Sequence, residues 1–266
     1  MKNTQIISVI NQKGGVGKTT TVINLATALS FQQKKVLVID LDPQGNATTG
    51  FGITNTKNVK TVYDVLNGNC NFEETIQHTK IDNLKLVSSN VDLSGLEVET
   101  ASENRRAFLL KDKIDNFINS SKNDFSYIFI DCPPSLSLLT VMSLVVAKSL
   151  IVPLQAEFFA LEGLSQLMKT IERVKIKLNP QLEIRGVLLT MYDKRNKLSA
   201  QVDDEARKFF KEKVYQTVIP RNVRLSEAPS HGVPILIYDK LCAGSKSYSN
   251  FADEFLKQEN IMESAA

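Results

Sequence analysis

Apolar residues along the chain fall into short runs that are separated by longer amphipathic stretches. Most of these runs are apolar at consecutive positions, a pattern typical of strands that are buried on both faces of a parallel sheet. The runs predict seven strands, at Ile6–Ile10, Val36–Ile39, Leu84–Val87, Tyr127–Ile130, Leu150–Pro153, Ile184–Thr190 and Val214–Ile219.

The stretches between these runs have the apolar spacing of helices. They predict helices at Thr20–Phe31, Arg105–Asn119, Leu138–Ala147, Leu161–Leu178, Ala200–Lys213 and Tyr248–Gln258. Because strand and helix alternate almost throughout, we expect an α/β fold with a doubly wound, mainly parallel sheet and helices on both faces. Ligands of such sheets bind beyond the carboxyl ends of the strands. The segment Asn46–Asn58, rich in Gly, Thr and Asn, is expected to form a mobile loop.

Composition is that of one globular domain spanning residues 1–266, with 42% hydrophobic and 23% charged positions. A chain of this length buries enough apolar surface to fold without disulfides or a structural metal. The three cysteines, Cys70, Cys132 and Cys242, are too far apart in sequence for a C-x-x-C pair, which favours a reducing, cytoplasmic location. The longest apolar stretch, Leu136–Leu154, is interrupted by polar residues and does not predict a membrane-spanning helix.

The net charge of +3 is unevenly distributed along the chain. Residues 190–248 contain eleven Lys and Arg against seven Asp and Glu, whereas residues 249–266 contain one Lys against four acids. A local surplus of positive charge can bind phosphates, but a slightly lysine-rich solvated surface gives the same count. Charge alone therefore leaves both interpretations open.

A glycine-rich loop follows the first predicted strand and leads directly into a predicted helix. Its sequence is NQKGGVGKTT, residues 11–20. Glycines let backbone N–H groups turn towards an anion, and the helix N-terminus adds its positive end. In such a loop Lys18 would reach the β- and γ-phosphates of a nucleotide, and the Thr19 hydroxyl would bind Mg²⁺. The strict Walker A pattern is broken at its first position, where Gln12 replaces glycine.

Carboxylates follow two further predicted strands. Asp40 and Asp42 are two residues apart, so in an extended chain both side chains point the same way. Beside phosphates such a pair is repulsive unless a cation or an oriented water lies between, which favours a catalytic role over an Asp-Pro turn. A carboxylate is a weak base at neutral pH, so Asp42 would position the attacking water. Asp131 ends another buried run, where a Walker B carboxylate holds Mg²⁺.

The segment Lys13–Thr19, KGGVGKT, resembles the deviant Walker A motif of the ParA/MinD group of P-loop ATPases. The resemblance implies a P-loop NTPase fold, ATP and Mg²⁺ as cofactors, and ATP hydrolysis that is slow without a partner. The ATP-binding residues of the loop would be Lys13, Gly14, Gly15, Val16, Gly17, Lys18, Thr19 and Thr20.

The same resemblance implies roles in catalysis and metal binding. Asp42 would be the hydrolytic residue, and Lys13 and Lys18 would act with it. Lys13 would reach the phosphates bound by a partner in a nucleotide-sandwich dimer, although on physical grounds alone it could be a solvated flanking charge. Thr19 would ligate Mg²⁺, with Asp42 and Asp131 bound to the ion through water.

Two later segments, Pro153–Gly163 and Val218–Ser230, look like elements of Soj-type chromosomal ParA proteins, and the resemblance extends over roughly residues 4–258. It implies that Pro220 and Asn222 lie against the adenine and that Arg221 also binds ATP. An Asn amide offers both a donor and an acceptor to the base edge. The resemblance also places Arg195 and Arg224 on a DNA-contacting face, and both arginines lie in the positively charged segment.

The function that the resemblance implies is an ATP-dependent switch for chromosome or plasmid partitioning. An ATP-bound homodimer would bind double-stranded DNA nonspecifically and be released by hydrolysis that a ParB-like (Spo0J-like) partner stimulates, in the cytoplasm at the nucleoid. The alternatives are a MinD-like, membrane-associated division-site ATPase, another cargo-positioning ATPase of the ParA type, and a metabolic or iron–sulfur-carrying relative. The acidic residues 249–266 argue against binding to anionic membranes, and no N-terminal helix-turn-helix domain is expected.

Overall fold

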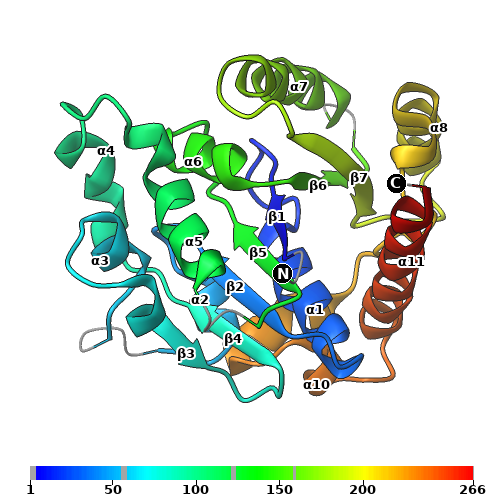
Figure 1. Cartoon of the computed structure of the whole chain (residues 1–266). Helices are drawn as coiled ribbons and strands as arrows, with labels where there is room; N and C mark the ends of the chain where they lie inside the picture. The colour runs from blue at the N-terminus through cyan, green and yellow to red at the C-terminus, as the bar shows by residue number, and fades with distance from the viewer. Residues whose placement is uncertain (1–3, 55–58, 121–123, 158–159, 266) are drawn as a thin grey trace.

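A computed structural model describes residues 4–54, 59–120, 124–157 and 160–265. Its centre is a seven-stranded sheet in the order β3-β4-β2-β5-β1-β6-β7 (Figure 1). The strands are β1 (Gln5–Val9), β2 (Val36–Asp40), β3 (Ile76–His78), β4 (Leu84–Val87), β5 (Tyr127–Asp131), β6 (Ser149–Gln155) and β7 (Glu183–Thr190). All neighbouring pairs are parallel except β3 with β4. The predicted doubly wound, mainly parallel sheet is thereby confirmed.

Helices cover both faces of the sheet. The longer ones are α1 (Lys18–Phe31), α5 (Leu109–Asn119), α6 (Leu138–Val146), α7 (Ala160–Lys177), α8 (Lys197–Phe210) and α11 (Ala243–Ala265). Short helices are α2 (Asn46–Gly50), α3 (Val62–Leu66), α4 (Leu96–Glu99), α9 (Val223–Glu227) and α10 (Ile235–Tyr238), with 3₁₀ turns at Phe72–Thr75, Val91–Gly95, Arg106–Phe108, Lys211–Lys213 and Ala228–His231. Among the helices in the described part of the chain, none combines the length and apolarity that a membrane span requires.

The hydrophobic core has two main layers because successive residues of a strand face opposite sides of the sheet. Val36 and Val38 of β2 pack with α1 and α11, whereas Leu37 and Ile39 pack with α5 and α6. A third cluster joins β6 and β7 to α7 and α8. All five residues of β2 and of β5 are buried, as the continuous apolar runs predict.

The predicted strand at Val214–Ile219 is wrong. This segment runs along the outer side of β7 and makes only isolated bridges, through Val214 and Pro220. Its ends pair with the backbone of β7, since the Tyr215 N–H donates to the Val187 carbonyl at 3.0 Å and the Ile219 N–H donates to the Leu189 carbonyl at 2.8 Å. Between them the pairing is interrupted, because the N–H groups of residues 216 and 217 donate to the Glu254 carboxylate at 2.7 and 2.8 Å. Proline at position 220 has no N–H to extend a ladder.

Two other parts of the structure differ from expectation. Strand β3 is a three-residue antiparallel edge strand without an apolar run, so the sequence pattern missed it. Asn46–Asn58 was expected to be a mobile loop, but its first residues form the helix α2, which is largely buried. Residues 55–58 of that segment lie outside the described part of the chain.

Candidate nucleotide site and neighbouring basic loops

The glycine-rich loop occupies residues 10–17 between β1 and α1, at the carboxyl edge of the sheet. Gly15 and Gly17 have φ angles of 74° and 91°, in the left-handed region that favours glycine. The side chain of Thr190, at the end of β7, donates to the carbonyl of Val16 at 2.8 Å, and Asn11 donates to the Pro153 carbonyl at 2.7 Å. Two neighbouring strands therefore hold the loop in place.

A cavity of about 450 Å³ lies over this loop. It is lined by Gly14, Gly15, Gly17, Lys18, Thr19, Thr20, Ile23, Asp42, Asn46, Thr49, Pro134, Met191, Pro229 and Ser230. Asp42 is the one carboxylate residue among the described residues of this lining. The structure thus brings together the loop and Asp42, which are separated by more than twenty residues in sequence.

Lys18 is only 7% exposed, and its ammonium donates to the carbonyl of Lys13 at 3.1 Å. Burial lowers the pKa of this ammonium, and the negative charges of Asp131 and Asp42 oppose that shift. A buried ammonium with few partners inside a cavity is a strong point of attachment for an anion.

Thr19 and Asp131 form the second polar pair of the site. The Thr19 hydroxyl donates to Oδ2 of Asp131 at 2.7 Å. Oδ1 of Asp131 is buried and has no hydrogen-bond partner within the residues that the structure describes. Burial, together with the charges of Asp40 and Asp42, raises the pKa of Asp131 well above its ordinary value. A carboxylate oxygen without a partner beside a threonine hydroxyl fits Mg²⁺, which takes oxygen ligands and retains several waters.

Asp40 and Asp42 have separate surroundings although they are two residues apart. Asp40 is fully buried and accepts hydrogen bonds from the N–H and hydroxyl of Thr48, both at 2.7 Å, and from the N–H of Asp42. These bonds hold α2 against the end of β2. Burial nevertheless raises the pKa of Asp40 to about 6. Asp42 accepts one hydrogen bond from the Gln44 N–H and faces the cavity.

The two lysines of the loop lie in different surroundings. Lys13 is half exposed, forms an ion pair with Glu157 and is absent from the described lining of the cavity over its own loop. Lys18, in contrast, lies inside that cavity. The side chain of Lys13 is therefore held by Glu157, outside the described lining of the cavity where its own chain would hold phosphates.

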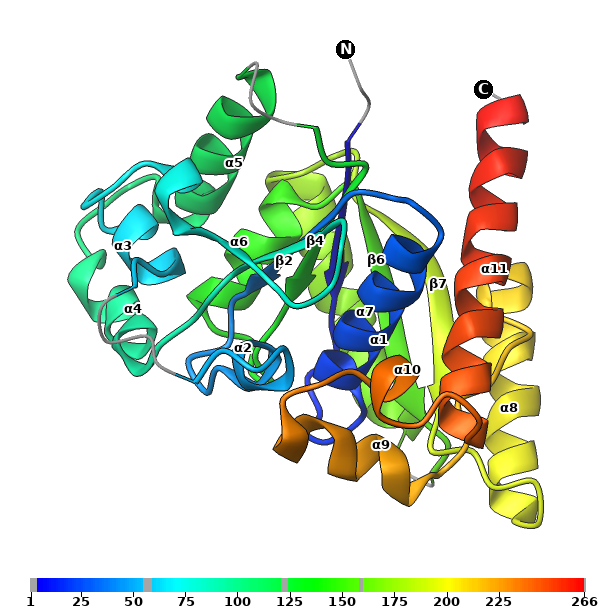
Figure 2. The ribbon, with the colours of Figure 1, turned by 90° about the horizontal axis from the view of Figure 1, so that it is seen from below.

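A second cavity, of about 250 Å³, adjoins the first and shares Gly17, Thr20, Met191 and Pro229 with it. Its lining includes the three predicted ATP-binding residues Pro220, Arg221 and Asn222. Sequence reasoning missed further lining residues from distant elements: Thr190, Met191, Ile219, Leu225, Ser226, Pro229 and Tyr248. Four of them lie within the segment Val218–Ser230, but no motif marks Thr190, Met191 or Tyr248, which the packing of β7 and α11 brings to this edge (Figure 2).

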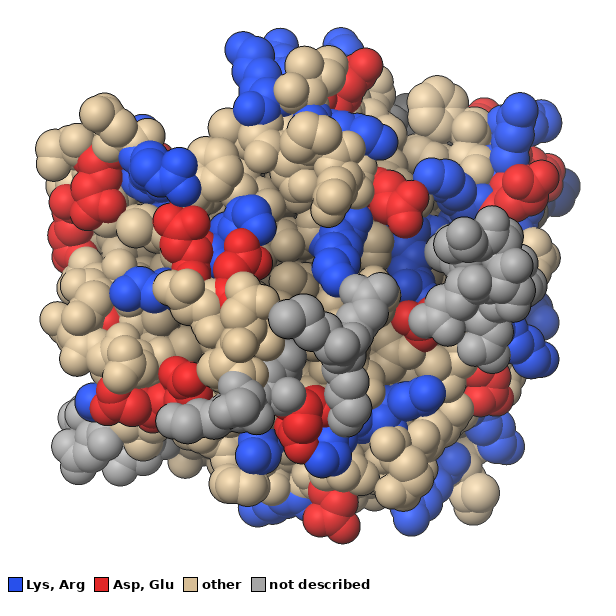
Figure 3. Space-filling view, viewed as in Figure 1, with Lys and Arg blue, Asp and Glu red and all other residues tan. Residues whose placement is uncertain are grey.

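The predicted DNA-contacting arginines lie on two neighbouring segments, called the basic loops: residues 191–197, where β7 leads into α8, and residues 220–227, which include α9. Arg195 lies between β7 and α8, and Arg224 is in α9. The Arg221 N–H donates to the Tyr192 carbonyl at 3.3 Å, which links the loops. Asn222 caps α9 by accepting from the N–H of Arg224 at 2.9 Å. In the space-filling view, Lys and Arg spread along the right-hand edge over α8, whereas acids gather over α3 and α4 (Figure 3).

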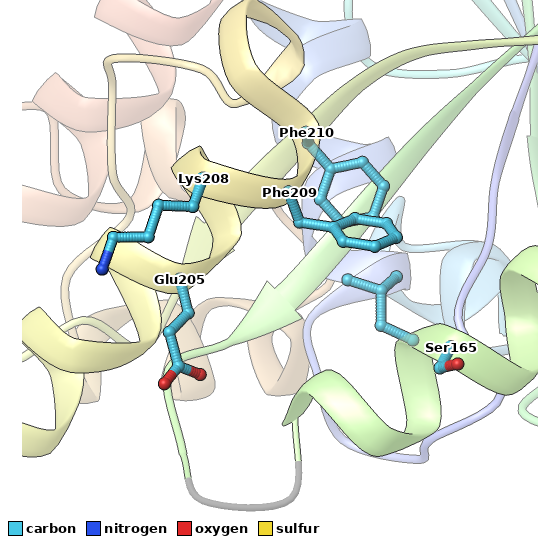
Figure 4. A pocket seen from close by; sticks show the side chains of 6 residues that line it. Ser165, Glu205, Lys208, Phe209 and Phe210 are labelled. Atoms are coloured by element: carbon cyan, nitrogen blue, oxygen red, sulfur yellow. The ribbon is translucent and has the colours of Figure 1, made fainter.

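Another hollow, of about 380 Å³, lies between α7 and α8 (Figure 4). It is lined by Leu164, Ser165, Glu205, Lys208, Phe209 and Phe210, and the Phe209 side chain is 69% exposed. Among the described residues that line this hollow, none is predicted to bind nucleotide or DNA.

Comparison with solved structures identifies the class of protein. A structure named cobyrinic acid a,c-diamide synthase from Mycobacterium smegmatis, with bound ATP analog and magnesium, matches with a TM-score of 0.84 and 35% identity, covering 96% of this chain and 94% of the other. The septum site-determining protein MinD from Pyrococcus horikoshii, complexed with Mg-ADP, matches with a TM-score of 0.78 and 26% identity over 97% and 98%. Together with the loop geometry, these matches define a P-loop ATPase fold of the ParA/MinD type.

Sequence relatives narrow this class to a family. A family model described as an AAA domain matches residues 4–184. The chromosome partitioning protein ParA of Caulobacter vibrioides is 50% identical, covering 98% of this chain and 97% of its own. The sporulation initiation inhibitor protein Soj of Bacillus subtilis is 47% identical over 94% and 97%. The chain belongs to the ParA/Soj family of chromosome-partitioning ATPases.

Proposed function

We propose that this chain is an ATP-driven dimerising switch that partitions a chromosome or plasmid. With ATP and Mg²⁺ bound, two copies would close on each other and bind double-stranded DNA at the nucleoid. Hydrolysis, slow by itself and stimulated by a ParB-like partner, would release them. The full-length similarity to ParA and Soj supports this cycle.

The observation that carries the proposal is the separation of the two loop lysines. Lys18 is buried in the cavity of its own chain, whereas Lys13 is half exposed and paired with Glu157 at the surface. A cation held beside the phosphate cavity but outside it suits the phosphates of a second copy. The ion pair with Glu157 is partly exposed and is therefore weak enough to exchange.

The proposed hydrolytic roles are supported by the cavity lining and by the hydrogen bond from Thr19 to Asp131. Lys18 would neutralise the phosphates, and Asp42 would orient the attacking water. Thr19 would hold Mg²⁺, with Asp42 and Asp131 bound to the ion through water. When bound, the ion would neutralise the charge that develops on the phosphate oxygens. Pro220 and Asn222 would contact the adenine in the adjoining cavity, where Arg221 would also bind ATP.

DNA would be held by Arg195 and Arg224. Both are exposed, and the helix α9 that carries Arg224 has only five residues. Contacts from arginine to phosphate are independent of base sequence and weaken as salt rises. One protomer offers only a small patch, so a dimer that places two patches on one duplex would bind far more strongly.

The alternatives are less well supported. The structure from P. horikoshii named MinD is 26% identical, whereas relatives named as chromosome-partitioning proteins are 43–50% identical. A MinD-like membrane anchor needs a basic amphipathic helix, but α11 between residues 249 and 259 carries Asp253, Glu254 and Glu259 against Lys257. If the chain instead had a metabolic role, like that in the name of the M. smegmatis synthase, its ATP hydrolysis would depend on a metabolic substrate.

The decisive experiment measures binding to a DNA duplex of random sequence at several salt concentrations, with ATP, with ADP and without nucleotide. Tight binding is expected only with ATP and Mg²⁺, with an affinity that falls steeply with salt. Equal binding in all three states would contradict a nucleotide switch. Absence of DNA binding, with binding to anionic vesicles in ATP instead, would favour the MinD-like alternative.

A further inference from the structure

The two arginines assigned to DNA are not free in this structure. Arg195 and Arg224 each donate to a carboxylate on the same short segment of chain. Because these pairs lie on the surface that would contact DNA, the role inferred for them rests on the proposed function.

Asp193 engages Arg195 through both of its oxygens. Nε of Arg195 donates to Oδ1 at 3.0 Å, and Nη2 donates to Oδ2 at 2.9 Å. This two-point contact fixes the guanidinium although its side chain is 91% exposed. These bonds, together with the charge of Arg221, lower the pKa of Asp193 to about 2, so the carboxylate is charged at any physiological pH.

Glu227 plays the same part for Arg224. Its Oε2 accepts from Nη1 of Arg224 at 2.9 Å and from the hydroxyl of Tyr238 at 3.3 Å. Asp239 adds a longer contact to Nε of Arg224, at 3.8 Å. The Arg224 guanidinium is therefore flanked by acids from α9 and from the end of α10.

Neighbouring cations on the same two loops differ from these arginines. Within the residues that the structure describes, Lys194, Lys197 and Arg221 are exposed and make no ion pair with a carboxylate. On these loops, acids therefore hold Arg195 and Arg224, the two exposed cations that the family resemblance assigns to DNA.

We propose that Asp193 and Glu227 compete with DNA phosphates for Arg195 and Arg224, and so keep the DNA affinity of a single protomer low. A phosphate has to displace a carboxylate at each arginine before it gains a contact. An exposed pair of this kind reduces affinity by about two- to fivefold. Because a dimer carries two copies of each pair, removal of one type of carboxylate should tighten dimer binding by about four- to 25-fold.

The test replaces each carboxylate by its amide and measures DNA affinity at one salt concentration with ATP. Asp193→Asn keeps an Oδ1 acceptor for the Arg195 N–H, which Asp193 now bonds at 3.0 Å, so the turn is preserved. Glu227→Gln keeps an acceptor for the Tyr238 hydroxyl. Each variant should bind DNA about four- to 25-fold more tightly than the wild-type chain, and the double variant should also bind measurably without ATP.

Asp112→Asn is the matched control. Asp112 lies on α5, is exposed and pairs with Arg105 at 3.4 Å, so this substitution changes net charge by the same amount at a comparable ion pair. Its DNA affinity should stay within about twofold of wild type. A second control is Asp193→Asn in an Arg195→Ala chain, where the gain should vanish because there is no arginine left to release.

The outcomes separate this proposal from the function on which it rests. If wild type binds DNA with ATP but the amide variants bind equally or more weakly, the carboxylates position the arginines instead of competing for them, and the proposal is overturned. A gain as large in Asp112→Asn, or one that persists without Arg195, would assign the effect to general charge and also overturn it. If no chain binds DNA with ATP, the proposed function itself fails.

Discussion

Two regions at the carboxyl edge of the sheet use charge in opposite ways. At the nucleotide site Lys18, in the cavity, and Asp40 and Asp131, outside its described lining, are buried, and burial shifts the pKa of each away from its ordinary value. On the two basic loops Arg195 and Arg224 are exposed and are paired with acids within a few residues. The buried charges of the first region are only partly compensated by neighbouring groups, whereas the exposed arginines of the second region are paired with acids close to them in sequence.

The difference arises from water. A buried charge that lacks a partner costs several kcal/mol, so a ligand that supplies one is bound strongly and a substitution acts almost as all or none. An exposed pair contributes about 0–1 kcal/mol and is screened by salt, so substitutions there give graded effects. The proposed switch would need both kinds of site: firm nucleotide binding, and DNA binding weak enough to depend on dimerisation.

The largest effect is expected at the buried lysine. Lys18→Ala should weaken ATP binding about a thousandfold, because the phosphates lose the cation that the cavity provides. Lys13→Ala, in the same loop, should leave ATP binding by the monomer within a few-fold of wild type and should prevent ATP-driven dimerisation. Titration with a fluorescent ATP analogue and light scattering measure the two properties. Similar ATP binding by Lys18→Ala and wild type would contradict the assigned phosphate site.

Asp42→Ala tests the one carboxylate residue found in the described lining of the cavity. ATP hydrolysis should fall about a hundredfold or more, because the attacking water loses its orienting group, while ATP binding is retained and the dimer accumulates. Phosphate release and sedimentation measure hydrolysis and dimerisation. Asp82→Ala, at an exposed position before β4, is the control and should hydrolyse normally. Normal hydrolysis by Asp42→Ala would remove Asp42 from the mechanism.

The cost of burying the charge of Asp40 can be measured through the pH dependence of the free energy of unfolding. Its pKa is about 6 in the folded chain against an ordinary value of 3.8, so the folded state holds the proton more tightly than the unfolded state. The resulting contribution to the free energy of unfolding is fully present below pH 3.8 and is lost as the pH rises through about 6. Asp40→Asn should remove roughly 3 kcal/mol of this pH dependence, as measured by urea unfolding between about pH 4 and 7. An unchanged pH profile would show that Asp40 titrates normally.

The smallest effect per residue is expected at the exposed arginines of the basic loops. Arg195→Glu or Arg224→Glu should weaken DNA binding by the ATP-bound dimer about tenfold or more, with a shallower dependence on salt, because phosphate contacts are lost. ATP binding and dimerisation should be unaffected. Arg105→Glu, which disturbs an exposed pair with Asp112 of α5, is the control. Joint loss of DNA binding and dimerisation would indicate a folding defect instead.

The sequence predicted most of the fold because burial on both faces leaves a strong pattern. The central strands β2, β4 and β5 match their apolar runs to within one residue. At residues 214–219 the apolar pattern misled, because a side-chain carboxylate accepts from the N–H groups of residues 216 and 217 and interrupts the pairing with β7. The short helix α2 was missed for a related reason, since the Asp40 carboxylate holds it from outside the segment.

For the site, local sequence determined the loop, its left-handed glycines, Lys18 and Thr19, because these features lie within ten residues and depend on backbone geometry. The tertiary structure alone decided that Asp42 lines the phosphate cavity, whereas Asp40 accepts hydrogen bonds from Thr48. It likewise decided that Lys13 lies outside that cavity, beside Glu157. It also decided which acids hold Arg195 and Arg224. Residue types and spacing specify which groups can carry charge. Burial and partners, which long-range packing sets, decide how strongly each charge acts.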